Sequence, residues 1–374
     1  DRRLGMTEIE TMRAMVLTGH GGMDKLVYHS SWMKPEPLQG EVLIKVGACG
    51  LNNTDVNTRT AWYSKGVTDA TTGDAFDTAS DDDSTWGGAG VTFPRIQGAD
   101  VCGTVEAVGP GADQGLIGRR VLIDTWLRDW DDPLNLDRCG YFGSECDGGF
   151  AEFTKIDQRH VHPITSDLTD AELATFATSS ITAENMLNRA EVGAGDTVLI
   201  PGASGGVGSA LIQLAKRRGA KTVAMCGADK ADQVHAIGPN AVLPRAPADL
   251  RTALHDAIGQ ETVTVVADVV GGDLWPQMID VVARGGRYTC AGAIAGPIVE
   301  FDLRTFYLRD LTFTGATIVP PGVFADLVGY IERGEIKPLL AATYPLEDLH
   351  KAQEAFIAKK HVGNIVVVPD GSAG

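Results

Sequence analysis

Over roughly the first 165 residues, hydrophobic and polar positions alternate in short runs that glycines and prolines interrupt. In 41–46, for example, Val42, Ile44 and Val46 fall on one face of an extended chain. Runs of the same kind predict a hairpin at 12–27 and strands at 101–108, 120–123, 149–155 and around 161. Short strands with frequent turns are typical of a β-rich, barrel-like module.

From Thr169 onward the apolar positions recur at helical spacing and alternate with short apolar runs. The expected helices are 170–189, 207–215, 230–237, 248–258 and 274–283, and the expected strands are 198–200, 220–226, 241–243, 263–269, 286–290 and 311–315. This alternation predicts a doubly wound parallel sheet with helices on both faces, so the fold class is α/β. Two amphipathic helices, 323–333 and 346–358, and a closing strand at 364–368 follow.

The segment 64–92 departs from both patterns because it is rich in Asp, Thr, Ser and Gly and includes three consecutive aspartates at 81–83. We interpret it as an acidic loop inserted at the surface and solvated by water. A lid over an active site is the alternative, since the segment directly follows a candidate catalytic stretch.

Composition excludes several classes of partner. The chain has 374 residues and a net charge of −17, and such a surface disfavours nucleic acid and anionic membranes. No apolar run reaches the roughly 18 residues of a membrane helix and no secretory signal is visible, so we expect a cytoplasmic protein. The six cysteines are scattered, without the density of a disulfide scaffold or the spacing of a zinc site.

A glycine-rich turn follows the strand at 198–200 and precedes the helix at 207–215. Such a turn lets the backbone approach a diphosphate closely, and the helix N-terminus offers free N–H groups. Ala203, Gly205 and Gly208 fill the three glycine positions of the dinucleotide fingerprint, with alanine in the first. The predicted cofactor-binding residues of the turn are Ala203, Ser204, Gly205, Gly206, Val207 and Gly208.

The end of the second strand of this unit bears on the choice of cofactor. NAD-binding folds place a carboxylate roughly 20 residues beyond the turn, to hold the ribose 2′-hydroxyl. Here Gly227 occupies that place, and Asp229 and Lys230 follow it. A small residue with a nearby cation suits the 2′-phosphate of NADPH, so we predict NADPH with contacts at Gly227 and Lys230. Asp229 weighs toward NAD, and a solvated Lys230 is the alternative.

Six short motifs follow one another along the chain. They are Asn-Asn-Thr-Asp at 52–55, Gln-Gly-Ala-Asp at 97–100, the glycine-rich turn at 201–208, Asp-Val-Val-Gly-Gly at 268–272, Gly-Gly-Arg at 285–287 and His-Val-Gly-Asn-Ile-Val at 361–366. Their order and intervals resemble those of the medium-chain dehydrogenase/reductase superfamily, over nearly the whole chain outside the insertion. The resemblance implies a GroES-like β-barrel catalytic domain formed by 6–168 and 318–374, a Rossmann domain formed by 169–317, and a homodimer.

The resemblance also indicates a branch of the superfamily. Its zinc alcohol dehydrogenases carry a zinc-binding Cys where this chain has Asn52 and a His where it has Asn53, and their Gly-His-Glu is here Gly98-Ala99-Asp100. An amide is a poor zinc ligand and alanine is none. The four-cysteine structural lobe is absent as well. The sequence therefore resembles the zinc-less quinone oxidoreductases, enoyl thioester reductases and alkenal reductases, and we expect no metal.

In that branch a Tyr lies eleven residues beyond the Asn of the Asn-x-x-Asp segment, which implies a catalytic role for Tyr63 and Asn52. Hydride delivery to an enone leaves an enolate, which a nearby phenol can stabilise or protonate. The family has Gly two residues before this Tyr, where this chain has Ala61. A packing role for Tyr63 and a turn-stabilising role for Asn52 remain open.

The same resemblance implies four further cofactor-binding residues and leaves one position in doubt. Thr182 matches a helix entry that approaches the nicotinamide, although a helix cap is the alternative. Gly292, Ala293 and Ile294 follow the strand whose backbone meets the nicotinamide in the family. Asn364 stands where the family often has Lys, so no contact is assigned there. The aromatic residues Trp126, Trp130, Tyr141 and Phe142 are candidates for either a substrate pocket or the core.

These observations predict a zinc-independent, NADPH-dependent oxidoreductase that transfers hydride to an activated C=C bond or a quinone. Enones, quinones and enoyl thioesters are the substrate classes. One alternative is metal-free carbonyl/alcohol chemistry, and another is a non-enzymatic NADPH-binding protein. A small-molecule substrate is the expected partner in the first two cases.

Overall fold

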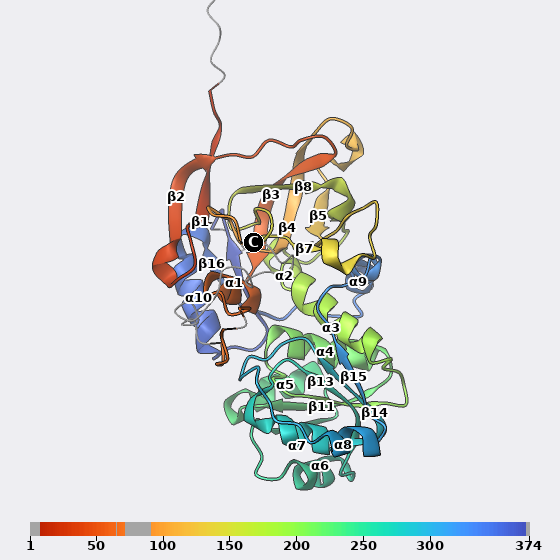
Figure 1. Ribbon diagram of the computed structural model, residues 1–374. Coiled ribbons are helices and arrows are strands. Elements are labelled where there is room, and N and C mark those ends of the chain that lie inside the picture. Colours follow the sequence, from red (N-terminus) through yellow and green to blue (C-terminus); the bar gives the residue numbers. More distant parts are fainter. Residues whose placement is uncertain (1–7, 65, 72–90, 372–374) are drawn as a thin grey trace, which may run out of the picture.

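The computed structural model describes residues 8–64, 66–71 and 91–371 (Figure 1). Two parts lie one above the other in that view: a β-rich part, and an α/β part whose strands lie between helices. Helices α3 and α4 lie where the two parts meet. The acidic run at 81–83 and most of the predicted insertion, 72–90, fall outside the described residues.

The β-rich part is built on a sheet of seven strands. Its order is β16 (Leu340–Pro345), β17 (Asn364–Val368), β3 (Glu41–Gly50), β4 (Asp100–Val108), β5 (Arg120–Ile123) and β9 (Val161–Pro163), and β8 (Phe153–Asp157) also pairs with β3. Its pairs are antiparallel except β16 with β17. The C-terminal strand β17 therefore lies beside β3, which comes from the other end of the chain.

Smaller elements complete this part. Strands β1 (Thr11–Leu17) and β2 (Leu26–Met33) form the predicted hairpin, and β6 (Trp126–Leu127) pairs with β7 (Gly140–Tyr141). Helix α1 (Asn53–Arg59) follows β3, α9 (Val323–Glu332) contacts α3, and α10 (Leu349–Ala358) packs on β16 and β17. The core beneath the sheet contains Val42, Ile44 and Val46, which confirms the inward face predicted for that strand.

The second part confirms the predicted doubly wound sheet. Six strands, all parallel, run in the order β12 (Ala241–Pro244), β11 (Lys221–Cys226), β10 (Thr197–Ile200), β13 (Val263–Asp268), β14 (Val282–Cys290) and β15 (Thr312–Gly315). The helices around this sheet are α3 (Ala177–Arg189), α4 (Gly206–Arg217), α5 (Ala231–Ile237), α6 (Leu250–Ile258), α7 (Trp275–Asp280) and α8 (Leu303–Leu308), whereas α2 (Asp170–Leu173) packs on β3, β4, β16 and β17 of the β-rich part. The strand order reverses between β10 and β13, and ligands of such sheets bind in the crevice at that point.

Several predicted boundaries were wrong. The helix expected over 274–283 ends at Asp280, because Val282 and Ala283 already pair in β14. The strand expected from Gly149 begins at Phe153. Strand β16 and helices α1 and α8 were not predicted, since each is short and lacks a clear apolar period. No helix in the described residues has the length and apolar character that a membrane crossing requires.

Candidate cofactor site and active-site cleft

The glycine-rich turn joins β10 to α4 with Gly205 as the N-cap, at φ −75° and ψ 175°. A Cβ at Gly205 would meet only the Gly202 carbonyl, at 3.5 Å, so this side of the turn is open. A Cβ at Gly208 would collide with the backbone of Gly202 and Ala203, so the helix packs tightly on the turn there. An open turn beneath a helix N-terminus is the arrangement that accepts a diphosphate, and the residues present fit a dinucleotide.

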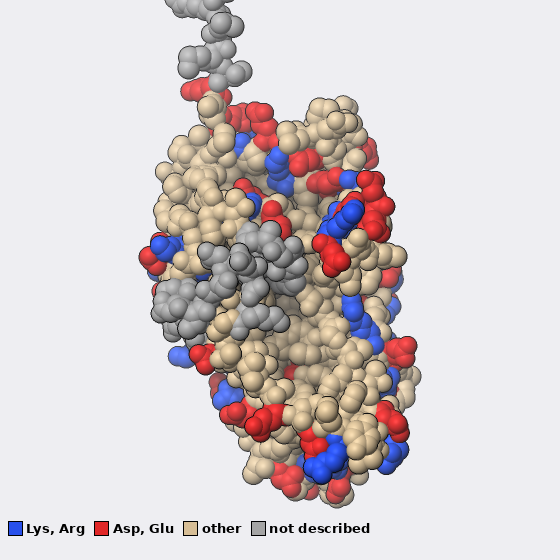
Figure 2. Space-filling view, viewed as in Figure 1, with Lys and Arg blue, Asp and Glu red and all other residues tan. Residues whose placement is uncertain are grey.

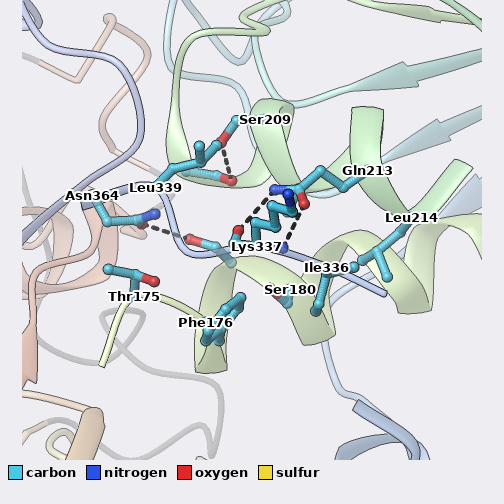
Figure 3. Close-up of a pocket in the computed structure, with 13 residues that line it drawn as sticks. Thr175, Phe176, Ser180, Ser209, Gln213, Leu214, Ile336, Lys337, Leu339 and Asn364 are labelled. Carbon is cyan, nitrogen blue, oxygen red and sulfur yellow. Dashed lines mark hydrogen bonds between the residues drawn. The ribbon is translucent and has the colours of Figure 1, made fainter. Parts of the chain in front are cut away.

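The back of the turn is held by the end of the chain (Figure 3). The hydroxyl of Ser179 donates to Oδ1 of Asn364 at 3.1 Å, and a Cβ at Gly206 would lie 2.8 Å from the same oxygen. The Gly363 amide donates to the Ser204 carbonyl at 2.9 Å. A cavity of about 20 Å³, enough for roughly one water molecule, lies among these residues. Asn364 therefore supports the turn from behind.

Cations gather beyond the end of β11. Lys230 lies in a short 3-10 helix and donates through Nζ to the backbone carbonyl of Lys359, the residue that ends α10. Lys359 Nζ in turn donates to Asn53 Oδ1 at 2.9 Å. Within the described part of the chain neither ammonium group pairs with a carboxylate.

Electrostatics at this cluster favour an incoming anion. Burial and the charge of Lys230 lower the pKa of Lys359 to about 7. Burial and the charges of Lys359 and Lys230 lower the pKa of His361 to about 4. Adjacent cations without a counterion are a site at which a phosphate lowers the free energy of the protein. Sequence reasoning missed Lys359, because the signal lies in the approach of two segments far apart in the chain.

A carboxylate also lies near this end of β11. A Cβ at Gly227 would be 2.8 Å from Oδ1 of Asp229, so the Asp229 side chain covers the glycine that ends the strand. A carboxylate in this place can accept hydrogen bonds from ribose hydroxyls. The neighbourhood thus carries one group that favours ribose and two that favour phosphate.

Gly292 and Ala293, two of the residues predicted to contact nicotinamide, line an open cleft of about 470 Å³ between the two parts of the molecule. Its lining includes Trp62 and Leu136 on one side and Gly292, Ala293 and Ile318 on the other. Between the two parts, this face of the molecule carries mostly uncharged side chains, and charged ones gather around the edge (Figure 2). A mostly uncharged cleft suits a neutral, conjugated substrate.

The described start of the insertion crosses this cleft. The Thr71 amide donates to the Ile294 carbonyl at 3.0 Å, and the indole N–H of Trp62 donates to the Asp69 carbonyl at 2.9 Å. Ile294 itself donates to the Val269 carbonyl at 3.1 Å. The first residues of the insertion therefore join the catalytic side of the cleft to the loop predicted to meet nicotinamide.

Tyr63 lies in the turn after α1, with its ring centroid 5.7 Å from that of Trp62. Burial raises the pKa of its phenol. Hydrogen bonds with Asn57 and Thr54 act in the opposite direction and lower the pKa, but the effect of burial is larger. The phenol is therefore protonated at neutral pH and able to donate. Ala61, two residues earlier, has φ +55°, which is the left-handed conformation that glycine adopts without strain.

Asn52 is the N-cap of α1. Its backbone N–H donates to Oδ2 of Asp55 at 2.8 Å in a capping box. Burial raises the pKa of Asp55 to about 8, and the nearby charge of Asp100 contributes. Burial also raises the pKa of Asp100 to about 6, while Thr178 and the Asn52 amide favour its charged form. Two buried carboxyl groups thus lie behind the cleft.

Thr178, at the start of α3, connects this pair to a second phenol. Its hydroxyl lies 2.5 Å from Asp100 Oδ1 and also hydrogen-bonds the hydroxyl of Tyr141. Tyr141 packs at 5.3 Å against Trp126, and burial raises the pKa of its phenol well above the usual value. Sequence reasoning named Tyr141 only as an aromatic candidate and missed Asp55, Asp100 and Thr178 as a cluster.

The other candidates fall in different places. Thr182 lies one turn beyond Thr178 on the same face of α3 and is half-buried. It lies inside the helix, which rules out the cap interpretation for this residue. Phe142 is fully buried in the barrel core, so the interpretation as a pocket residue was wrong for it. Trp130 donates to Nε2 of His160 at 3.2 Å.

The residues in the place of zinc ligands do not fit a zinc ion. Asn52 presents an amide and Ala99 a buried methyl group. Cys49 is fully buried, and burial raises the pKa of its thiol well above the usual value, which disfavours the thiolate that zinc requires. Among the described residues, no three His, Cys, Asp or Glu side chains gather closely enough to hold a metal ion.

Two family models match the chain. The Alcohol dehydrogenase GroES-like domain matches residues 38–166, and the Zinc-binding dehydrogenase model matches residues 206–333. The chain belongs to the medium-chain dehydrogenase/reductase superfamily. Its barrel is thus the GroES-like domain and its parallel sheet the Rossmann-like domain of that superfamily.

Three similar proteins illustrate the range within the superfamily. A solved structure from Sinorhizobium meliloti 1021, provisionally described as an alcohol dehydrogenase, is 45% identical with a TM-score of 0.89, covering 98% of this chain and 99% of that one. Rat quinone oxidoreductase is 25% identical, covering 92% of this chain and 94% of its own. The chloroplastic NADPH-dependent alkenal/one oxidoreductase of Arabidopsis thaliana is 25% identical, covering 96% and 80%.

Proposed function

We propose that this protein is a metal-independent, NADPH-dependent reductase of activated C=C bonds or quinones. The observation that carries the proposal is the pairing of an open dinucleotide turn at Gly205 with a cleft whose would-be metal positions hold Asn52 and Ala99. A Lewis acid would polarise an isolated carbonyl for hydride attack, whereas conjugation lets the accepted electron pair spread onto oxygen without a metal.

The chain's own residues have distinct parts in this scheme. NADPH, when bound, supplies hydride. Gly292, Ala293 and Ile294 would hold the nicotinamide on one side, and Thr182 would contact it from α3. Tyr63, protonated at neutral pH, donates to the oxygen of the enolate or of the hydroquinone anion that forms. Asn52 fixes the start of α1 and so the place of Tyr63.

The choice of NADPH rests on Lys230 and Lys359. Their unneutralised charges, with the neighbouring His361, offer a phosphate three nitrogen donors from two parts of the molecule. The Asp229 carboxylate favours NADH instead, because it can accept hydrogen bonds from ribose hydroxyls. Direct competition between NADPH and NADH for the free protein measures whether the two lysines or Asp229 determine the preference.

The comparisons support the proposal at a coarse level. The three similar proteins described above are oxidoreductases by name. The names of the rat and Arabidopsis relatives include a quinone, an alkenal and NADPH. At about 25% identity these names indicate a class of reaction and leave the substrate to experiment.

The test is steady-state NADPH oxidation against a panel of enones, quinones and enoyl thioesters, with NADH measured in parallel. We expect turnover of at least one class with NADPH, and a fall of about 10²-fold or more in kcat for Tyr63→Phe. Silence of the wild-type protein across the panel contradicts the proposal. Metal analysis of the purified protein, before and after chelation, tests metal independence separately.

A second candidate is metal-free carbonyl/alcohol oxidoreduction, which the 45% identical structure described as an alcohol dehydrogenase favours. It predicts alcohol-dependent reduction of NADP, which the first candidate does not. Tight NADPH binding without turnover of any compound, unchanged in Tyr63→Phe, supports a non-enzymatic role instead.

We also propose the domain division 6–168 with 318–374 against 169–317, and a homodimer. Leu303, Tyr307 and Leu308 on α8 are each more than half exposed, beside the edge strand β15. Such an apolar edge is a natural contact for a second copy. Light scattering of the wild type against Tyr307→Asp tests the dimer.

A further inference from the structure

Thr178 occupies an unusual position between two acids. Its hydroxyl lies 2.5 Å from the Asp100 carboxyl and also hydrogen-bonds the Tyr141 phenol, while its backbone N–H donates to the same Asp100 oxygen at 3.1 Å. Asp100 and Tyr141 are only 2% and 3% exposed, whereas Thr178 is half-buried. Of the three residues, Thr178 is therefore the one with a partly exposed side chain, and it shares a face of α3 with Arg189, which lines the cleft.

The helix that carries Thr178 also leads to the substrate cleft. Thr178, Thr182, Asn185 and Arg189 follow at intervals of three and four and share one face of α3. Asn185 and Arg189 both donate to the carbonyl of Ile318, at 3.4 and 3.2 Å, and Ile318 lines the cleft. Thr178 thus lies about one turn from the residue predicted to face nicotinamide.

The hydrogen bonds of this hydroxyl depend on the protonation of Asp100. When Asp100 is ionised, the Thr178 hydroxyl donates to it. When Asp100 is protonated, the Thr178 oxygen accepts from both Asp100 and Tyr141, and its own proton is free to point elsewhere. A hydroxyl with two donors behind it is a good donor to a third partner.

We propose that Thr178 delivers a proton to the reduced substrate in the cleft, with Asp100 as the source of that proton and Tyr141 as the residue that positions the hydroxyl. This inference rests on the proposed function. It adds a proton route distinct from Tyr63, which lies in the turn after α1 and not on α3.

The step balances as follows. Hydride adds to the β-carbon of the enone, and the C=C electron pair forms the enolate. The enolate α-carbon then takes the Thr178 proton as the O–H bond of Thr178 breaks. The Asp100 proton moves to Thr178 Oγ1, so the hydroxyl is restored and Asp100 is left as a carboxylate. Water reprotonates Asp100 after the product leaves.

The surroundings of Asp100 suit this exchange. The ionisable groups that interact with it are Asp55 of α1, Cys49 of β3 and Tyr141 of β7. None of these is a cation, so the cluster lacks a charge that would hold Asp100 permanently ionised. Burial keeps its pKa near 6, within reach of both protonation states in the physiological range.

The experiment compares Thr178→Val with Thr178→Ser in the holoenzyme, using an acceptor that the wild type reduces in the panel above. Valine keeps the shape of threonine and removes the hydroxyl, while serine keeps it. We expect kcat to fall about 10- to 100-fold in Thr178→Val with KM for NADPH unchanged, and to recover in Thr178→Ser. Asp100→Asn tests the proton source through the pH profile of kcat.

For an α-substituted enone reduced in D₂O, the wild type places deuterium on one face of the α-carbon, and Thr178→Val loses this selectivity because water protonates the enolate. Wild-type rate and selectivity in Thr178→Val overturn the proposal and leave the proposed function intact. A pH profile of kcat unchanged in Asp100→Asn overturns the role of Asp100. A wild type without turnover of any acceptor overturns both the proposal and the proposed function.

Discussion

The ammonium group of Lys230 donates to the backbone carbonyl of Lys359, and this contact joins the nucleotide-binding sheet to the segment between α10 and β17. Lys359 then reaches Asn53 at the start of α1. A dinucleotide phosphate bound between the two lysines would touch residues on both sides of the cleft, so cofactor binding and the closeness of the two parts are expected to be coupled.

Replacing Lys359 by methionine should therefore weaken NADPH binding about 10- to 100-fold, since a charge-assisted hydrogen bond to phosphate is lost. NADH binding should hardly change. Fluorescence titration of the free protein measures both. Lys360→Met is the matched control because Lys360 is the exposed neighbour, and equal losses for NADPH and NADH in Lys359→Met would contradict the assignment.

The affinity for NADPH should also depend on pH. In the free protein the pKa of Lys359 is about 7, and a bound phosphate raises it. Above pH 7 binding then requires uptake of a proton, so affinity falls as pH rises, by up to about tenfold per unit. Lys359→Arg keeps its charge throughout, so its affinity should stay flat over the same range. A wild-type curve as flat as that of the variant would refute the link.

The two adjacent glycines of the turn should respond differently to alanine. At Gly206 the new methyl would collide with Ser179 and Asn364, so we expect a loss of about 1–3 kcal/mol in the free energy of unfolding. At Gly205 it would enter open space, so stability should change by less than about 1 kcal/mol while NADPH affinity falls. Urea denaturation and cofactor titration of both variants separate the two effects, and the reverse pattern would be incompatible with the site.

Ala61 should tolerate glycine unusually well. Removing a buried methyl and loosening the unfolded chain cost about 1–2 kcal/mol at an ordinary position such as Ala48. At Ala61 the relief of left-handed strain offsets about 1–2 kcal/mol of that loss. Ala61→Gly is therefore expected to be near neutral and Ala48→Gly destabilising. Equal losses in urea denaturation would argue against strain at Ala61.

Much of the fold could be predicted from periodicity. The buried strands and amphipathic helices of the α/β part have apolar patterns that are visible within a short stretch of sequence. The strand at 263–268 and the helix that begins at Gly206 are examples. The short elements were not predicted. Strand β16 is defined by its pairing with β17, and helix α1 by its capping box at Asn52. A local pattern carries no record of such long-range pairing.

The candidate site divides in the same way. The turn at 203–208 could be placed from motif spacing, and Gly292 and Ala293 from the family resemblance. In the structure the turn lies before α4, and Gly292 and Ala293 line the cleft. Lys359, Asp100 and Thr178 could not, because each owes its environment to a partner more than 70 residues away in the chain. Lys359 contacts Lys230, and Thr178 contacts Asp100. Burial of an ionisable group is a property of the packed molecule, which no spacing reveals.

The segment from Gly363 to Val368 supports the glycine-rich turn through hydrogen bonds at Ser204 and Asn364. It then pairs with β3 as strand β17. A nascent chain therefore lacks both the closed barrel and the buttressed turn until that segment has emerged from the ribosome. Affinity for the nucleotide is therefore expected to arise late in synthesis.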